Sequence, residues 1–137
     1  MPEDLGPAAG KIRVKITSPL SLIADFEANS VEVPTPNGRR LMMPKTAPMF
    51  CLIKAGKVII HQEQKDPIIY QVSAGVCEMR RGICAIMAWG MPAKKIDFEK
   101  VKILLDEAEQ VSPHFGSAAA GQEIRDRMAF YRLILKQ

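Results

Sequence analysis

Short runs that alternate apolar and polar residues fill the first two thirds of the chain. In residues 11–16 every second residue is apolar, which is the pattern of a strand with one buried face. Further strands are predicted at residues 21–26, 29–33, 41–43, 57–61, 68–72, 76–79 and 83–89. Residues 48–53 fit either a strand or a loop. This spacing of short strands predicts an antiparallel β-sandwich or barrel over residues 11–90.

Glycine residues mark two of the turns between these strands. Asn37-Gly38 is a strong turn dipeptide, because both residues tolerate a positive φ. Ala74-Gly75 predicts a bend or bulge, since a missing side chain lets two backbones approach closely. Both positions are therefore expected to separate neighbouring strands.

The period of the apolar residues becomes helical after Gly90-Met91-Pro92. Asp97 is a suitable N-cap for a first helix. The apolar face of that helix is predicted to consist of Val101, Leu104, Leu105, Ala108 and Val111. The stripe of a second helix is predicted to consist of Ile124, Met128, Tyr131 and Leu135. Because the connection between them is short, residues 91–137 are predicted to form an antiparallel helical hairpin.

The composition agrees with one domain, or with one small domain and an appendage. Of the 137 residues, 47% are hydrophobic and only 6% aromatic, so the core must consist mainly of Val, Ile, Leu and Met. Residues 1–10 are rich in Pro, Gly and Ala and are predicted to be disordered, with no signal peptide. No apolar stretch reaches the roughly 18 residues of a membrane span. Any link to a membrane is therefore expected to be indirect, through partners.

Candidate chemistry is sparse. His61 and His114 lie in different halves of the chain, without further ligands at metal-binding spacing. Cys51, Cys77 and Cys84 are odd in number and irregularly spaced, which indicates free thiols in a reducing compartment. No nucleophile or phosphate-binding motif is present. The sequence predicts no catalytic residue, no metal site and no enzyme activity.

The net charge of +4 invites comparison with nucleic-acid-binding proteins. The basic residues are thinly spread, and no run of five occurs. Small β-barrels that bind nucleic acids carry stacking aromatic residues in a basic groove, whereas the predicted strands here carry aliphatic residues. A nucleic-acid partner is therefore not expected.

A series of short motifs resembles the ε subunit of rotary F-type ATP synthases. Residues 38–49 (GRRLMMPKTAPM) resemble the Gly turn and the Pro-x-His-Ala-Pro-Leu segment of that family. Residues 53–56 (IKAG) resemble its Leu-Lys-Pro-Gly, and residues 72–79 (VSAGVCEM) its Val-Ser-Gly-Gly-Phe-x-Glu-Val. The order and spacing of these motifs, followed by the helical hairpin, extend the resemblance over residues 11–137. Leu41, Thr46 and Ala74 replace a Gly, a His and a Gly, which indicates a divergent bacterial member.

The resemblance implies that the sandwich docks on the γ subunit and rests on the ring of c subunits. It implies contacts with γ at Ser18, Thr46, Ser73 and Gly75. It implies contacts with the c-ring at Gly38, Arg39, Arg40 and Met42. Arg39 stands where some members carry an acidic residue, so we expect a contact of changed charge there.

For the hairpin, the resemblance implies regulation of ATP hydrolysis through contacts with the α and β subunits of the catalytic head. The basic residues expected to make these contacts are Arg125, Arg127, Arg132 and Lys136. Some members bind ATP through an Ile/Leu-Asp-x-x-Arg-Ala motif, which corresponds to residues 96–101 here. Asp97 is retained, but Lys100 replaces the Arg and loses its bidentate fork for phosphate. ATP binding is therefore expected to be weak or absent, and no cofactor is predicted.

The predicted function is that of a non-catalytic rotor subunit, which couples γ to the c-ring and regulates hydrolysis. Its expected location is peripheral, at the cytoplasmic face of a bacterial inner membrane. The alternative is a stand-alone binding module, in which a β-sandwich with a helical lid binds a ligand or another protein. Formation of a stoichiometric complex with γ separates these two functions.

Overall fold

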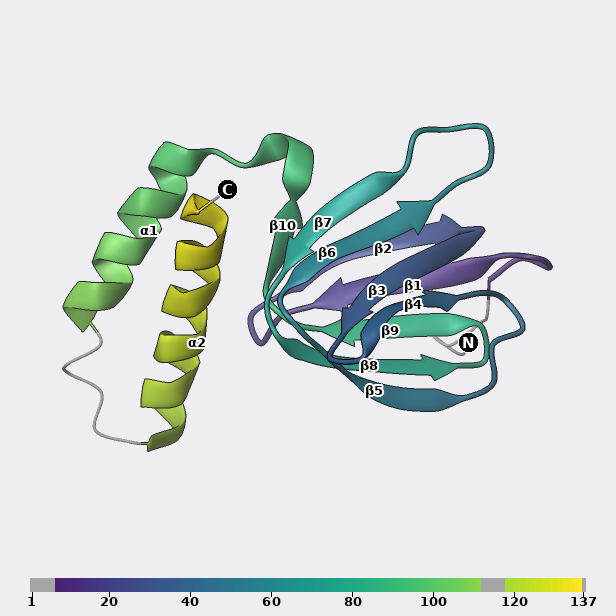
Figure 1. Cartoon of the computed structure of the whole chain (residues 1–137), viewed down its shortest axis with the longest axis horizontal. Coiled ribbons are helices and arrows are strands. Elements are labelled where there is room, and N and C mark those ends of the chain that lie inside the picture. Colours follow the sequence, from purple (N-terminus) through teal and green to yellow (C-terminus); the bar gives the residue numbers. More distant parts are fainter. Residues whose placement is uncertain (1–6, 112–117, 137) are drawn as a thin grey trace. The chain divides into compact units, whose positions relative to one another are not determined.

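A computed structural model describes residues 7–111 and 118–136 (Figure 1). The chain divides into two compact units, Met1–Ala93 and Lys94–Gln137. The described strands lie in the first unit and both α-helices in the second. Most of the segment predicted to be disordered, together with His114, lies outside the described residues.

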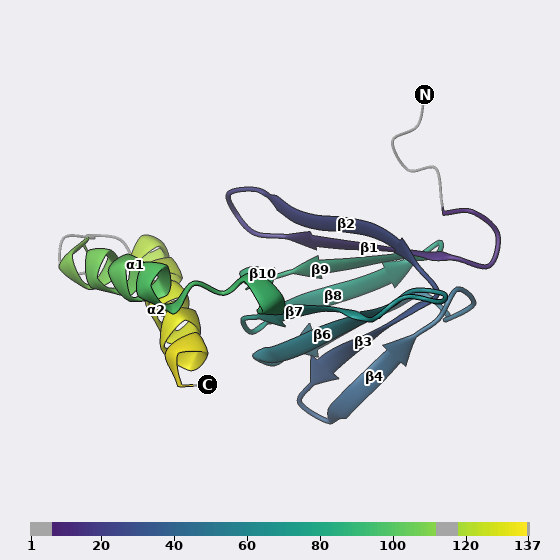
Figure 2. The same cartoon turned by 90° about the horizontal axis from the view of Figure 1, so that it is seen from above.

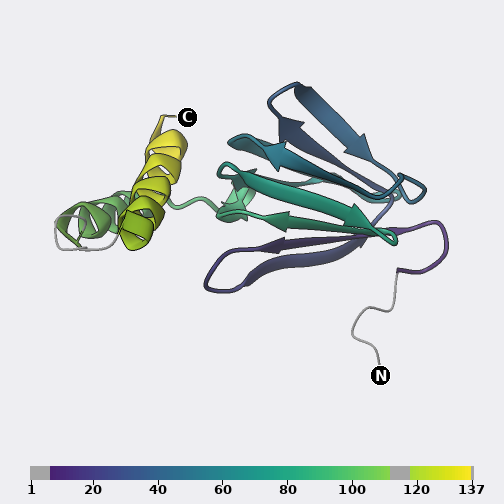
Figure 3. The same cartoon turned by 90° about the horizontal axis from the view of Figure 1, so that it is seen from below.

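The first unit is a sandwich of two five-stranded sheets that lie face to face (Figures 2 and 3). Sheet A has the strand order β2-β1-β9-β8-β5, in which β1 pairs with β9 in parallel and the other neighbours are antiparallel. Its strands are β1 (Ile12–Thr17), β2 (Leu22–Ala28), β5 (Met49–Ile53), β8 (Gly75–Arg80) and β9 (Ile83–Met87).

Sheet B has the strand order β10-β7-β6-β3-β4 and is antiparallel throughout. Its strands are β3 (Ser30–Thr35), β4 (Gly38–Met42), β6 (Gly56–His61), β7 (Ile68–Val72) and β10 (Gly90–Pro92). The predicted sandwich is confirmed, and the ambiguous segment 48–53 contains strand β5. Strand β10 was not predicted. It lies at the edge of sheet B, directly before the residues in which the apolar period becomes helical.

The alternating residues of the strands form the core between the sheets. On β1, Ile12, Val14 and Ile16 are fully buried while the residues between them are partly exposed. The core consists largely of Val, Ile and Met side chains, as the low aromatic content predicts. One aromatic pair contributes, with the rings of Phe26 and Tyr70 centred 6.2 Å apart. Burial of this apolar surface is the main force that holds the two sheets together.

The second unit is a hairpin of α1 (Phe98–Val111) and α2 (Ala118–Leu135), preceded by a short 3₁₀ turn at Ala93–Lys95. The two helices pack against each other, and Arg132 Nη2 lies 3.3 Å from Glu109 Oε1 across the pair. The helical hairpin is confirmed. Of the described helices, neither combines the length and apolar character that a membrane crossing requires.

The buried faces of the helices differ in part from the predicted stripes. On α1, Val101 and Ala108 are buried but Val111, the last residue of the helix, is exposed. On α2, the large side chains described as buried are Met128, Phe130, Tyr131 and Ile134. The predicted stripe included Met128 and Tyr131 but missed Phe130 and Ile134, since the buried face of α2 is broader than a narrow i, i+3, i+4 stripe.

Candidate interaction surfaces

The outer face of sheet A carries a row of mainly apolar side chains near one end. The strand register places its members directly opposite one another across all five strands. In order across the sheet, the row consists of Leu52, Val76, Met87, Thr17 and Leu22. Leu52 is 61% exposed, Met87 41% and Leu22 57%. We call these five residues the apolar row. A contiguous exposed apolar patch of this kind is typical of a site that binds another protein.

Ser18, one of the predicted γ contacts, lies in the turn between β1 and β2 at the end of the apolar row. Its Oγ accepts hydrogen bonds from the backbone N–H groups of Leu20 and Ser21, both at 3.2 Å. Leu20, in the same turn, is 69% exposed. The Ser18 side chain therefore fixes the turn that displays Leu20.

Two other predicted γ contacts have internal roles. Ser73 is buried, and its Oγ accepts a hydrogen bond from the backbone N–H of Trp89 at 2.9 Å. At Gly75, a Cβ atom would lie only 2.1 Å from the carbonyl oxygen of Met87. Glycine is therefore required here, because β8 and β9 approach too closely for any side chain. These residues hold Val76 beside Met87 in the apolar row.

Thr46, the fourth predicted γ contact, closes the turn before β5. Its Oγ1 accepts a hydrogen bond from the Met43 N–H at 2.8 Å, and its own N–H donates to the Met43 carbonyl at 3.0 Å. The turn leads into Met49, which pairs with Met79 at the end of sheet A away from Leu52. The structure therefore separates Thr46 from the apolar row.

The predicted c-ring contacts lie in and after the turn between β3 and β4. Gly38 has a φ of 110°, and its carbonyl accepts a hydrogen bond of 2.6 Å from the Thr35 hydroxyl. Gly38 and Arg40 are exposed, and Arg40 borders a shallow groove of about 350 Å³. Met42, in contrast, is 0% exposed. Its side chain belongs to the sandwich core, which corrects its assignment to the ring contact.

Arg39 folds back over sheet B. Its Nη2 donates to the Lys57 carbonyl at 2.8 Å, and its Nε lies 3.5 Å from Glu32 Oε1. The second carboxylate oxygen of Glu32 lies 2.7 Å from His61 Nε2. The hydrogen bond with His61, followed by that with Arg39, lowers the pKa of Glu32 below its usual value. Arg39 is therefore tethered to sheet B while its side chain stays 41% exposed.

The four basic residues predicted on the second helix do not share one face. At about 100° per residue, Arg125 and Arg132 align along α2 and Lys136, directly after its end, continues the line, while Arg127 is turned away and is half-buried. Arg125 donates to Gln122 Oε1 at 3.0 Å, and Arg132 is tied to α1. Three of the four residues thus form one exposed basic stripe.

Asp97 and Lys100, the two candidate nucleotide contacts, lie at the start of α1. The Asp97 carboxylate accepts hydrogen bonds from the backbone N–H groups of Glu99 and Lys100, at 3.1 and 3.2 Å. This is the geometry of an N-cap, which confirms that prediction. The Asp97 side chain thus has a complete structural role without a nucleotide.

The cysteines are free thiols. Cys77 and Cys84 lie buried on neighbouring strands with their Sγ atoms 3.5 Å apart. The hydrogen bond to Cys84, followed by burial, raises the pKa of the Cys77 thiol, so this thiol is a poor nucleophile. Within residues 7–111 and 118–136, no group of three His, Cys, Asp or Glu side chains is placed to hold a metal ion.

The sequence motifs did not reveal the apolar row. Large apolar residues at outward positions of a strand are the signal that could have done so. On β5, Phe50 and Leu52 are outward and exposed, but a continuous apolar run hides the alternation that would mark them as outward.

A sandwich with an exposed apolar face and a helical hairpin defines a protein that acts through contacts with other proteins. The comparison with protein families shows the family to which the chain belongs. Residues 11–91 match the family model described as "ATP synthase, Delta/Epsilon chain, beta-sandwich domain". The chain therefore belongs to this family, and the resemblance predicted from its motifs is confirmed.

Known relatives agree with this family. The chain is 27% identical over 119 residues to the ATP synthase epsilon chain of Stenotrophomonas maltophilia, covering 86% of this chain and 85% of that one. It is 37% identical over 70 residues to the epsilon chain of Rickettsia felis, covering 50% and 62%. A chain in the mitochondrial ATP synthase of Euglena gracilis has the same fold, with a TM-score of 0.61 at 19% identity over 96% of this chain and 86% of that one.

Proposed function

We propose that this chain is the ε-type subunit of an ATP synthase rotor, and that it is not an enzyme. Its sandwich binds γ and rests on the c-ring, so that the three turn together. Its hairpin contacts the α and β subunits of the catalytic head and restrains ATP hydrolysis. The family match over the sandwich and the named epsilon-chain relatives support this function.

The apolar row is the structural feature that best supports a contact with γ. The apolar row exposes the side chains of Leu52, Met87 and Leu22 to solvent. Such exposure does not stabilise a free-standing sandwich and is typical of a protein-binding surface. Burial of such surface against a partner is the usual source of binding energy. We therefore assign γ binding to the apolar row and the Ser18 turn, with Ser73 and Gly75 as the residues that hold the row in register. Thr46 acts only through its turn.

The turn around Gly38 and Arg40 is the proposed c-ring contact. Because Arg39 is bound to Glu32 and to the Lys57 carbonyl, Arg40 is the basic side chain that a ring loop would meet first. Replacement of Arg39 by Glu places two carboxylates together and is expected to displace the turn and impair coupled proton pumping. Unchanged pumping in the reconstituted complex contradicts this assignment.

The hairpin is the proposed regulatory element. The basic stripe of Arg125, Arg132 and Lys136 suits an acidic surface on the head. Truncation after Ala93 removes the hairpin while leaving β10 in sheet B. It is expected to raise the rate of ATP hydrolysis by the reconstituted complex. An unchanged rate contradicts the regulatory role.

The location that follows is peripheral, within the membrane-associated complex. We place the chain at the cytoplasmic face of a bacterial inner membrane, since the relatives named above as epsilon chains are bacterial. Contact with the membrane is indirect, through the c-ring.

The decisive experiment mixes the purified chain with γ from the same source, followed by size-exclusion chromatography with light scattering. A one-to-one complex is expected. Absence of a complex with folded γ would contradict the rotor function and leave the stand-alone binding module, which no structural observation favours at present.

A further inference from the structure

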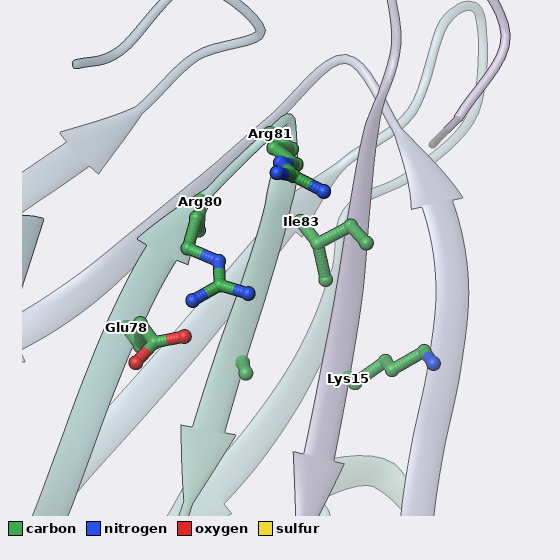
Figure 4. Close-up of a pocket in the computed structure, with 6 residues that line it drawn as sticks. Lys15, Glu78, Arg80, Arg81 and Ile83 are labelled. Carbon is green, nitrogen blue, oxygen red and sulfur yellow. The ribbon is translucent and has the colours of Figure 1, made fainter. Parts of the chain in front are cut away.

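A basic pocket lies on the outer face of sheet A, next to the apolar row. It has a volume of about 220 Å³ and lies over β1, β8, β9 and the turn between β8 and β9 (Figure 4). The residues that line it are Lys15, Glu78, Arg80, Arg81, Ile83 and Ala85. Ala85, which lies opposite both Lys15 and Glu78 in the strand register, leaves the space between their longer side chains open.

The pocket carries three positive charges and one negative charge. Neighbouring Arg13 is neutralised by Asp25 through two hydrogen bonds of 2.7 and 2.8 Å. Among the described residues, Lys15, Arg80 and Arg81 have no such partner. Figure 4 shows the Arg80 and Arg81 guanidinium groups over the ends of β8 and β9. This corner of the sheet therefore presents excess positive charge to whatever covers it.

Arg81 adopts a backbone conformation that costs energy. It has a φ of 53° and precedes Gly82, with a φ of 75°, in the two-residue turn between β8 and β9. Such turns favour Asn-Gly, and a left-handed conformation costs other L-residues about 1 kcal/mol. Backbone strain of this kind is characteristic of functional positions. Arg81 therefore makes the turn less stable than Asn would at this position, and it places a positive charge at the surface.

The basic pocket and the apolar row are close enough to lie under one partner. Lys15 and Thr17, and likewise Ala85 and Met87, are separated by one residue on the same strand. Side chains at that spacing lie on the same face about 7 Å apart. A standard protein interface covers about 800 Å² on each partner, which spans both.

We propose that Lys15, Arg80 and Arg81 form the charged flank of the γ-binding face and recognise an acidic patch on the γ subunit. The proposal rests on the proposed function and names the chemistry of its partner surface. The apolar row supplies the affinity, and the basic pocket supplies the orientation and the rate of encounter. Charges at the edge of an interface act chiefly on the association rate and on its salt dependence.

The test measures the rate of association with γ by stopped-flow fluorescence as a function of ionic strength. The variant combines Arg80→Gln with Arg81→Asn, which removes two charges and places the preferred Asn-Gly in the turn. A matched control combines Lys57→Gln with Lys65→Gln, which removes two exposed charges of β6 and of the loop after it. Thermal unfolding of each variant reports on the fold.

The Arg variant is expected to associate about tenfold more slowly at about 20 mM salt, and within about twofold of the unmodified chain at about 0.5 M. Its thermal stability is expected to be retained or increased. The Lys variant is expected to match the unmodified chain. Equal slowing by both variants, or no slowing by either, overturns the proposal. Failure of the unmodified chain to bind γ overturns the proposed function instead, so the two failures are distinguishable.

Discussion

Replacement of Leu52 and Met87 by Ser is expected to weaken binding to γ, while the sandwich still folds with reduced stability. Both side chains lie opposite Val76, Leu52 at the end of the apolar row and Met87 at its centre. Both are partly exposed in the free chain, so the sandwich draws only part of the possible burial energy from them. In the complex they are expected to be covered, and Ser at either position forfeits that burial.

The size of the effect follows from the exposed fractions. Full burial of a Leu or Met side chain contributes about 2 kcal/mol. With 61% of Leu52 and 41% of Met87 still exposed, an interface can add about 1.2 and about 0.8 kcal/mol. Their joint loss of about 2 kcal/mol corresponds to a roughly 30-fold higher Kd.

Isothermal titration calorimetry with γ measures this Kd, and urea unfolding of the free chain measures the stability. The matched control is Leu41→Ser, which removes an equally large side chain that is 50% exposed on β4 of sheet B. A Kd within threefold of the unmodified value for the double variant would refute the assignment of the apolar row to γ. A 30-fold change for Leu41→Ser would refute it equally, because the effect would then not depend on the face.

Three further predictions concern stability. Gly75→Ala is expected to destabilise the sandwich by about 3 kcal/mol, because its Cβ would collide with the Met87 carbonyl; urea unfolding measures this, and a loss below about 1 kcal/mol would show that β8 moves aside freely. Asp97→Ala removes the cap of α1 and is expected to cost about 1 kcal/mol, seen as about fivefold faster amide exchange in the first turn; an unchanged exchange rate would exclude the capping role. The pKa of Glu32 is lowered from 4.5 by His61, so its stabilising effect is present above pH 4.5 and lost as the pH falls through the lower folded pKa. The stability difference between the unmodified chain and Glu32→Gln should shrink on acidification below pH 4.5, and a constant difference would contradict the pairing.

Alternation along the strands was sufficient to predict most of the sandwich. It failed at β10, because three residues are too few to show a period and the pairing of Met91 with Gln71 is a long-range contact. It was ambiguous at β5 for a different reason. Phe50 and Leu52 face outward yet are apolar, so both faces of that strand look buried from the sequence alone.

The motif residues were a better guide to the fold than to the contact surface. Three of the residues in the family-like motifs act inside the sandwich. Met42 is a core side chain, Ser73 accepts a hydrogen bond, and Gly75 allows β8 and β9 to approach closely. At a turn or core position, backbone geometry and packing limit which residue types fit. Such positions are therefore easy to recognise from the sequence. A contact surface depends on which side chains a register brings together, and the apolar row draws one residue from each of five strands that are scattered along the chain.

The three positions at which the sequence departs from the family motifs, Leu41, Thr46 and Ala74, do not require the residue that the family carries. Ala74 and Leu41, which stand in place of glycines, are exposed and lie outside the regions of positive φ, so an added side chain meets little resistance. Thr46, in place of a histidine, closes its turn through its own hydroxyl. The sandwich can therefore diverge at these positions while its geometry is kept, whereas Gly75, which no other residue can replace without moving β9, is unchanged. A divergent sequence thus preserves the scaffold of the rotor subunit.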